Sequence, residues 1–242
     1  MLKVGIVGDG KWGKIIKKTL SEFSKVVFVS NTKKTYRTKK EIDYCFIASS
    51  DSSHFKIAKY FLKKKIPVFC EKPLSRNFLE CQMLVNLSKK KETPIFINHI
   101  ECFKKKIIQI KKINFIVRTK KSEKNINNMK EILWKLCYHD LYLLYNHLKK
   151  KKLKIKLIYK NKSQIMFEIK SSEKSFNFFY DNNSEQKKHY LNRTNFISKK
   201  NYLKKMITDL LYKKNIDIKE NNRQALFCVK TILLIEKIIF KA

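Results

Sequence analysis

All four glycines of this 242-residue chain lie within its first thirteen positions. The last three form the pattern G-x-G-x-x-G, which follows a short apolar run at Leu2–Val7 and precedes apolar residues at helical spacing. A strand, such a turn and a helix in this order are typical of a dinucleotide-binding fold, because glycine lets the backbone approach a pyrophosphate, and the first helical amides hold the phosphates. The alternative is a glycine-rich turn that binds no ligand. We therefore predict that the cofactor is bound by Gly8, Asp9, Gly10, Lys11, Trp12 and Gly13.

Residues 1–98 alternate between apolar runs and amphipathic stretches, the pattern that builds a parallel sheet with helices on its faces. The runs predict strands at Lys3–Val7, Val26–Ser30, Tyr44–Ala48, Pro67–Cys70 and Pro94–Asn98. The amphipathic stretches predict helices at Lys11–Phe23, Ser53–Lys63 and Phe78–Lys91. We expect a Rossmann domain over residues 1–98, with a doubly wound parallel sheet.

Residues 99–242 have a different pattern, with strand-like runs joined by short turns. Strands are predicted at Ile113–Thr119, Lys154–Tyr159, Gln164–Lys170 and Lys174–Tyr180, and helices at Ile132–Leu148, Tyr202–Tyr212 and Arg223–Ile239. This part predicts a truncated C-terminal α+β domain on a mainly antiparallel sheet, with closing C-terminal helices. The chain as a whole is expected to be an α/β protein of two domains.

The formal charge of +36 would by itself indicate a nucleic-acid partner. Only five of the 56 basic residues are arginine, whereas proteins that read phosphates and bases rely on the bidentate arginine side chain. We expect weak non-specific attraction to nucleic acid and no specific nucleic-acid partner. A basic nucleic-acid-binding protein is kept as a remote alternative.

The six cysteines show neither a C-x-x-C pair nor another metal-ligand spacing, so no metal site is predicted. Their use fits a reducing compartment. The N-terminus lacks the pattern of a signal peptide, and the late apolar stretch from Ala225 to Phe240 is short and interrupted by charges. We expect a cytoplasmic protein with no membrane partner.

Two further segments carry polar residues in a specific order, a serine-rich turn at Ala48–His54 and the tripeptide Glu71-Lys72-Pro73. Together with the glycine pattern they resemble the signature of the glucose-fructose oxidoreductase, inositol dehydrogenase and rhizopine-catabolism family of NAD(P)-dependent oxidoreductases. The segment Asn98–Phe103 is similar to a run found in members that act on nucleotide-linked amino sugars, with Cys102 in place of arginine. The resemblance implies hydride transfer between nicotinamide and a sugar or nucleotide sugar, and a homo-oligomer.

The resemblance also implies site residues. Hydride transfer from an alcohol needs a cation beside the reacting oxygen and a base for its proton. Lys72 and His139 are expected to fill these roles as one catalytic unit across the domain cleft, although Lys135 stands where the family usually has aspartate, four residues before the histidine. Asp140 either orients His139 or points away. In the alternative reading, Lys72 is a surface lysine and His139 a core histidine.

Ser49, His54, Glu71 and Lys72 are predicted to contact the cofactor. For His54, capping a helix is an equally good alternative to contacting the cofactor. For Glu71, the alternative is an ion pair with Lys72 or another neighbour. The residues after the second strand, Ser30-Asn31-Thr32-Lys33-Lys34, contain no carboxylate to repel a 2′-phosphate, and Asn31 is expected to touch the cofactor. We therefore favour NADP over NAD. A further alternative is a homologue that binds the dinucleotide but has little catalytic activity.

Overall fold

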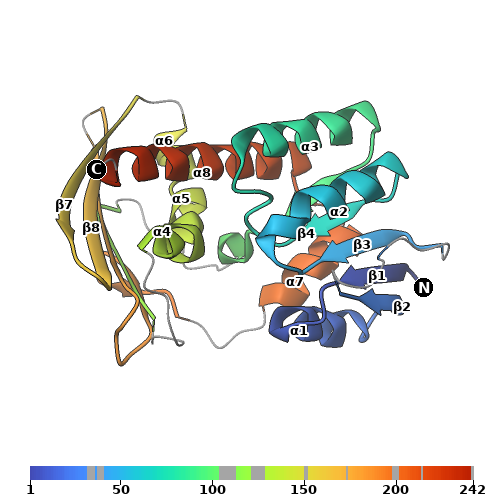
Figure 1. Cartoon of the computed structure of the whole chain (residues 1–242). Helices are drawn as coiled ribbons and strands as arrows, with labels where there is room; N and C mark the ends of the chain where they lie inside the picture. The colour runs from blue at the N-terminus through green and yellow to red at the C-terminus, as the bar shows by residue number, and fades with distance from the viewer. Residues whose placement is uncertain are drawn as a thin grey trace. The chain divides into compact units, whose positions relative to one another are not determined.

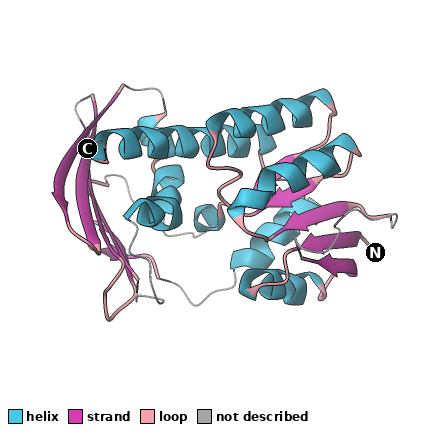
Figure 2. Cartoon of the chain, viewed as in Figure 1, coloured by secondary structure: helices cyan, strands magenta, loops and turns pink. Residues whose placement is uncertain are grey.

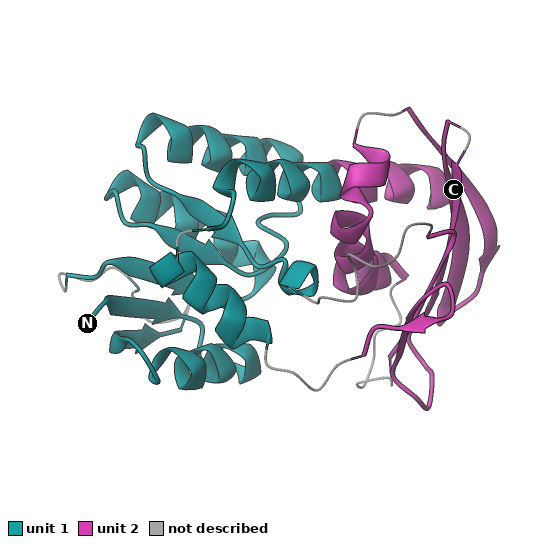
Figure 3. Cartoon of the chain, turned by 180° about the vertical axis from the view of Figure 1, so that it is seen from behind, with its two compact units in different colours: residues 1–103, 201–229 teal, residues 104–200, 230–242 magenta. Residues whose placement is uncertain are grey.

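The protein is described here by a computed structural model that covers residues 1–31, 36, 41–103, 113–120, 129–149, 152–172, 174–197, 202–213 and 215–240. The chain forms two compact units, each made of two segments (Figure 3). Unit 1 comprises Met1–Phe103 and Asn201–Val229, and unit 2 comprises Lys104–Lys200 and Lys230–Ala242. Over the described residues, no helix has the length and apolar character that a membrane crossing requires.

Unit 1 is built on a five-stranded parallel sheet, as the alternating pattern predicts (Figure 1). Its order in space is β2-β1-β3-β4-β5, so the direction of strand progression reverses at β1. The strands are β1 (Lys3–Val7), β2 (Lys25–Ser30), β3 (Tyr44–Ile47), β4 (Val68–Cys70) and β5 (Ile95–Ile97). In doubly wound sheets, ligands bind at the carboxyl ends of the strands beside such a reversal.

Helices cover both faces of this sheet (Figures 1 and 2). One face carries α2 (Asp51–Lys63) and α3 (Phe78–Lys90), and the other carries α1 (Lys11–Leu20) and α7 (Tyr202–Thr208), which continues into the π-helical turn η4 (Asp209–Lys213). On the α1 and α7 face, Phe46, Phe69 and Phe96 are paired across neighbouring strands, with ring centroids 4.9 and 5.5 Å apart. The predicted Rossmann sheet is thereby confirmed.

The structure groups the chain differently from the sequence-based division at residue 98. The helix α7 and the first part of α8 (Ile218–Ile239) belong to unit 1, although both were expected in the second domain. Leu203, Met206 and Ile207 of α7 are buried in the same core cluster as the sheet residues. The helix α7 therefore packs on the apolar face of the sheet beside α1, because α1 alone leaves part of that face uncovered.

The start of α8 closes the edge of the sheet. The Asn221 side chain accepts a hydrogen bond from the Ile97 N–H at 2.8 Å and donates one to the Ile97 carbonyl oxygen at 2.9 Å. The N–H and the carbonyl oxygen of Ile97 are thus both hydrogen-bonded to one side-chain amide. Buried backbone groups at the edge of a sheet need such partners.

Unit 2 contains a six-stranded sheet in the order β11-β10-β6-β9-β8-β7. Only β6 and β9 run parallel among its pairs, so the expected mainly antiparallel sheet is confirmed. The strands are β6 (Phe115–Thr119), β7 (Leu153–Lys160), β8 (Gln164–Ser171), β9 (Lys174–Asp181), β10 (Lys188–Leu191) and β11 (Thr194–Asn195). The last two were not predicted, because they are short and rich in polar residues.

The predicted helix Ile132–Leu148 is irregular in the structure. It consists of α4 (Met129–Ile132), a π-helical turn η3 (Leu133–Cys137), α5 (Tyr138–Leu143) and α6 (Tyr145–Leu148). The indole N–H of Trp134 in the π turn donates to Glu236 Oε1 of α8 at 3.0 Å, within unit 2. Such π turns inside helices are frequent at functional sites.

Candidate functional site

The carboxyl ends of four strands bring the sequence motifs of unit 1 to one edge of the sheet. Four residues that directly follow strands donate their backbone N–H groups to a neighbouring strand: Gly8 to Ser30, Ala48 to Val7, Glu71 to Ile47 and Asn98 to Cys70. These bonds are 2.7 to 2.9 Å long. The glycine turn, the serine-rich turn, Glu71-Lys72-Pro73 and Asn98 therefore share the edge where such sheets bind ligands.

The three glycines of the turn have different structural needs. Gly8 has φ +122° and a Cβ there would lie 2.4 Å from the Ala48 backbone, while a Cβ at Gly13 would lie 2.0 Å from the Gly8 carbonyl oxygen. At Gly10 a Cβ would meet no protein atom within 4 Å. Gly8 and Gly13 are thus required by packing, whereas the space beside Gly10 is open. That opening fits a pyrophosphate at the start of α1, whose N-terminus has no side-chain cap.

The end of β2 holds the residues expected to select the cofactor. Asn31 Nδ2 donates to Asp9 Oδ2 at 3.3 Å, which joins this strand end to the glycine turn. Ser30 Oγ is buried and has no hydrogen-bond partner among the described residues. Thr32, Lys33 and Lys34, on which the NADP prediction also rests, lie outside the described residues. A hydroxyl and an amide are therefore the described polar groups at this position.

Glu71 is the centre of a polar cluster. Its Oε1 accepts hydrogen bonds from the Trp12 indole N–H and from Asn98 Nδ2. Asn98 Oδ1 in turn accepts from the Ile100 N–H at 3.1 Å, which fixes the orientation of the amide. Burial raises the pKa of Glu71 above its ordinary value, although these donors and the neighbouring Lys72 oppose the shift. Glu71 thus links Trp12 of the glycine turn to the end of β5.

Asn98 is a member of this cluster that sequence reasoning did not assign to the site. Its place directly after the fifth strand was the available signal, because strand ends converge in this type of sheet. The next residue, His99, is buried with Nδ1 3.2 Å from Gln224 Oε1. Burial, and to a smaller extent the positive charge of Lys72, lowers the pKa of His99 to about 3. His99 is therefore neutral at ordinary pH.

His54 is fully enclosed, with 1% of its surface exposed. Its Nδ1 lies 2.7 Å from the Pro73 carbonyl oxygen and its Nε2 3.1 Å from the Ser49 carbonyl oxygen. A neutral imidazole has one N–H and can donate to only one of them, and burial lowers the pKa of His54. Both ring nitrogens thus face backbone oxygens, and the ring connects the serine-rich turn with Glu71-Lys72-Pro73. Ser49 Oγ lies 2.7 Å from Ser53 Oγ.

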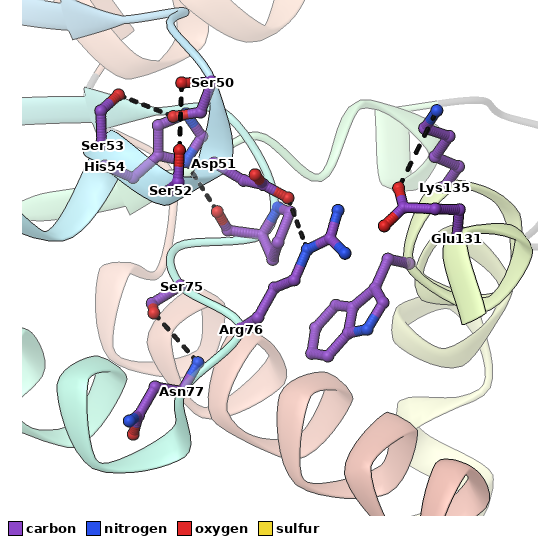
Figure 4. A network of polar contacts seen from close by, with 12 residues as sticks. Ser50, Asp51, Ser52, Ser53, His54, Ser75, Arg76, Asn77, Glu131 and Lys135 are labelled. Atoms are coloured by element: carbon purple, nitrogen blue, oxygen red, sulfur yellow. Dashed lines mark hydrogen bonds and ion pairs between the residues drawn. The ribbon is translucent and has the colours of Figure 1, made fainter. Parts of the chain in front are cut away.

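An ion pair joins the same two segments. Arg76 Nε donates to Asp51 Oδ2 at 2.6 Å, from the loop after β4 to the first turn of α2 (Figure 4). Asp51 is also the acidic residue in the first turn of α2. With His54, this pair gives the two loops two independent connections.

In unit 2, His139 lies in α5 and contacts a residue that sequence reasoning did not single out. Its Nδ1 lies 3.0 Å from the Tyr142 hydroxyl oxygen. The spacing of three residues on one helix face was the signal that could have identified Tyr142. Lys135, in the π turn, lies 3.9 Å from Glu131 Oε2 (Figure 4). Lys135 is thus paired with a carboxylate of the preceding helical turn.

Asp140 points away from His139 into the sheet of unit 2 and is fully buried. Its carboxylate accepts from Arg118 Nη2 at 2.7 Å and from the Tyr180 hydroxyl at 3.0 Å, and lies 3.0 Å from His189 Nε2. Burial would raise the pKa of Asp140, but Arg118 and His189 outweigh it and lower this pKa to about 2. Of the two roles considered for Asp140, the structure supports the one in which it points away.

Comparison with known proteins agrees with this geometry. Residues 14–99 match the model of an oxidoreductase family with an NAD-binding Rossmann fold. A segment of 55 residues is 38% identical to the uncharacterized oxidoreductase YgjR of Escherichia coli, and it spans 23% of this chain and 17% of that relative.

Solved structures resemble the fold over nearly the whole chain. The UDP-N-acetylglucosamine 3-dehydrogenase GnnA of Acidithiobacillus ferrooxidans has a TM-score of 0.79 at 13% identity, covering 97% of this chain and 96% of its own. The WlbA dehydrogenase of Thermus thermophilus, in complex with NAD and UDP-GlcNAcA, has a TM-score of 0.71 at 12% identity, with 96% and 95% covered. The dehydrogenase MviM of Clostridium difficile has a TM-score of 0.73 at 16% identity, with 100% and 99% covered. Residues 14–99 thus match the glucose-fructose oxidoreductase, inositol dehydrogenase and rhizopine-catabolism family of oxidoreductases, and the chain as a whole has the fold of the dehydrogenase structures named above.

Proposed function

We propose that the protein is an NADP- or NAD-dependent oxidoreductase that interconverts a hydroxyl and a keto group on a sugar or nucleotide sugar. The observation that carries the proposal is the shared sheet edge in unit 1, where an open glycine turn lies with Glu71-Lys72-Pro73. Relatives of the same fold that act on or bind UDP-linked sugars support the substrate class. When bound, the nicotinamide accepts or donates the hydride.

In this proposal the chain's own residues have separate tasks. The glycine turn and the start of α1 bind the pyrophosphate, and Ser30 and Asn31 face the adenosine ribose. The Lys72 ammonium donates a hydrogen bond to the reacting oxygen and stabilises its developing negative charge. His139 takes the proton of the substrate hydroxyl during oxidation and returns it during reduction. His54 holds the loop that carries Lys72.

Cofactor binding is tested by titration of the purified protein with NADPH and NADH, followed by nicotinamide fluorescence. Gly10→Val should abolish binding while the fold stays intact, because its Cβ enters the open space and meets no protein atom within 4 Å. Lys18→Val, at an exposed position in the last turn of the same helix, is the matched control and should bind normally. Unchanged affinity in a folded Gly10→Val variant would refute the site.

Catalysis is tested by turnover with a panel of sugars and nucleotide sugars. Lys72→Met and His139→Ala should each lower kcat by at least about a hundredfold, the scale of general acid-base catalysis, with cofactor affinity nearly unchanged. Wild-type turnover in either variant would remove that residue from the mechanism.

A second candidate is a homologue that binds the dinucleotide without efficient turnover. It is favoured by Lys135, which occupies the position of the family's aspartate and is paired with Glu131. Cofactor binding without turnover on any sugar of the panel would select it. Restored turnover in Lys135→Asp would connect the loss to this position.

A further inference from the structure

We propose that Tyr142 is the positioning residue of His139: its hydroxyl oxygen accepts the Nδ1–H of the imidazole and so assigns proton exchange with the substrate to Nε2. The inference rests on the proposed function, because it gives a partner to the histidine that exchanges the substrate proton. It gives His139 a partner other than Asp140, for which the sequence left open both orienting this histidine and pointing away.

The contact lies within one helix and is packed on the tyrosine side. Tyr142 follows His139 by three residues in α5, so both side chains lie on one face of the helix. The hydroxyl oxygen is 3.0 Å from Nδ1, and the two rings meet at 74° with centroids 5.7 Å apart. Tyr142 is buried, and the ring of Tyr138 lies against it at 70° with a centroid distance of 6.2 Å. The phenol is thus held by packing as well as by its hydrogen bond.

Asp140 is committed elsewhere. Its carboxylate is surrounded by Arg118, His189 and Tyr180 in the core of unit 2. Turning it toward His139 would leave the buried guanidinium without this counter-charge, which is strongly destabilising. A residue next to the histidine in sequence projects about 100° away around a helix, so this division of roles follows from the helix geometry.

A tyrosine in this place has a chemical consequence. A neutral imidazole carries one N–H, and an acceptor at Nδ1 keeps the proton there, which leaves Nε2 with its lone pair. During oxidation the hydroxyl proton of the substrate passes to Nε2 while the hydride leaves carbon for the nicotinamide, giving a carbonyl and an imidazolium. In reduction the same Nε2–H returns the proton. A carboxylate would hold the same tautomer but would also stabilise the imidazolium, whereas the neutral phenol adds no charge.

On the described part of this helical segment, two charged side chains lie within four residues of His139. Lys135 lies four residues before His139 and is paired with Glu131, and the Asp140 carboxylate is paired with Arg118. Both charges close to the histidine in sequence are therefore compensated by a partner. We assign the tautomer of His139 to its hydrogen bond with Tyr142 on the geometry of that contact.

The tautomer is measured on the full-length protein by long-range ¹H–¹⁵N correlation NMR of the His139 side chain. We expect the Nδ1–H form to dominate in the wild type and to lose that dominance in Tyr142→Phe, which keeps the ring and removes the acceptor. Tyr142→Asp should retain the Nδ1–H form and move the acid limb of the oxidation rate to higher pH. Tyr145→Phe, in the next helical turn with Lys149 over its ring, is the matched control and should resemble the wild type.

Kinetics then test the role. Tyr142→Phe should lower kcat at least about tenfold with unchanged cofactor affinity, as expected when a general base loses its orientation. A dominant Nε2–H form in the wild type, an unchanged tautomer in Tyr142→Phe, or wild-type turnover in that variant would each overturn the inference. Absence of turnover on every sugar would instead refute the proposed function, and the NMR result would still decide whether Tyr142 fixes the tautomer.

Discussion

The indole N–H of Trp12 donates to the Glu71 carboxylate, although the two residues are 59 positions apart in the chain. The same oxygen accepts from Asn98, so one buried carboxylate connects the glycine turn, the Glu71-Lys72-Pro73 loop and the end of β5. A shared acceptor makes these three segments dependent on one another. The geometry of Lys72 is therefore expected to respond to changes at Trp12.

Replacing Glu71 separates the effect of its hydrogen bonds from that of its charge. Glu71→Ala leaves two donors without this acceptor and should lower the free energy of unfolding by about 1–3 kcal/mol. Glu71→Gln keeps an acceptor oxygen. Because burial raises the pKa of Glu71 above 4.5, the wild type should lose stability relative to Glu71→Gln as pH rises through 4.5 toward the folded-state pKa. Denaturant unfolding at several pH values measures the stability of both variants. If the difference in unfolding free energy between wild type and Glu71→Gln does not change with pH, the expected pH dependence is contradicted.

The three glycines of the turn should respond differently to alanine. Gly8→Ala and Gly13→Ala force a Cβ to within 2.4 and 2.0 Å of backbone atoms, so each should destabilise unit 1. We expect losses of more than about 2 kcal/mol, in the range of overpacked positions. Gly10→Ala should change the free energy of unfolding little, because its Cβ meets open space. Thermal unfolding of the three variants makes the comparison, and equal melting temperatures would show that the turn relaxes around a side chain.

The buried Asp140 should be a major source of acid sensitivity. Asp140→Asn leaves Arg118 without its counter-charge and should cost about 3–5 kcal/mol at neutral pH. The pKa of Asp140 falls from 3.8 to about 2 on folding, so its stabilising contribution is complete above pH 3.8 and is lost as pH falls toward 2.

Unfolding between about pH 4 and pH 2 should therefore be steeper in the wild type than in Asp140→Asn. Glu185→Gln, at an exposed position, serves as the control and should follow the wild-type curve. Identical acid unfolding of wild type and Asp140→Asn would show that another group controls this range.

The cofactor preference should change with one residue after β2. Asn31→Asp introduces a carboxylate where NAD enzymes place one, so it should weaken NADPH binding by at least about tenfold and favour NADH. Asn86→Asp, an exposed position of α3 in the same unit, adds the same charge elsewhere and should leave the preference unchanged. If the ratio of the NADPH and NADH dissociation constants in Asn31→Asp equals that of the wild type, Asn31 does not determine the cofactor preference.

Local patterns predicted much of the fold, and contacts between distant segments account for what they did not. The β1 range was predicted without error, and the β8 and β9 ranges to within one residue, since their apolar residues alternate or are continuous. The strand β10 could not be identified, because Lys188 and His189 carry no apolar pattern and are held by pairing with β6. The place of α7 depends on which sheet face lacks a cover, and no short window of sequence contains that information.

The candidate site divides in the same way. The glycine turn and Glu71-Lys72-Pro73 are contiguous motifs and could be read directly from the sequence. One oxygen of Glu71 accepts hydrogen bonds from both Trp12 and Asn98. This arrangement depends on how three strands are aligned in the sheet, and a pattern along the sequence does not contain that information. The contact of His139 with Tyr142 was within reach of helical spacing, but the partners of Asp140 lie on strands 22 to 49 residues away.

The return of the chain to unit 1 through α7 has a consequence for biosynthesis. The five strands are complete by residue 97, yet Leu203, Met206 and Ile207, which cover one face of their sheet, are made about a hundred residues later. At a translation rate of about 5–20 residues per second, that face waits on the order of 5–20 seconds for its cover. During this interval Val4, Phe46 and Phe69 lack the part of their cover that α7 supplies in the folded unit. Unit 1 therefore matures late in translation, although most of its sequence is made first.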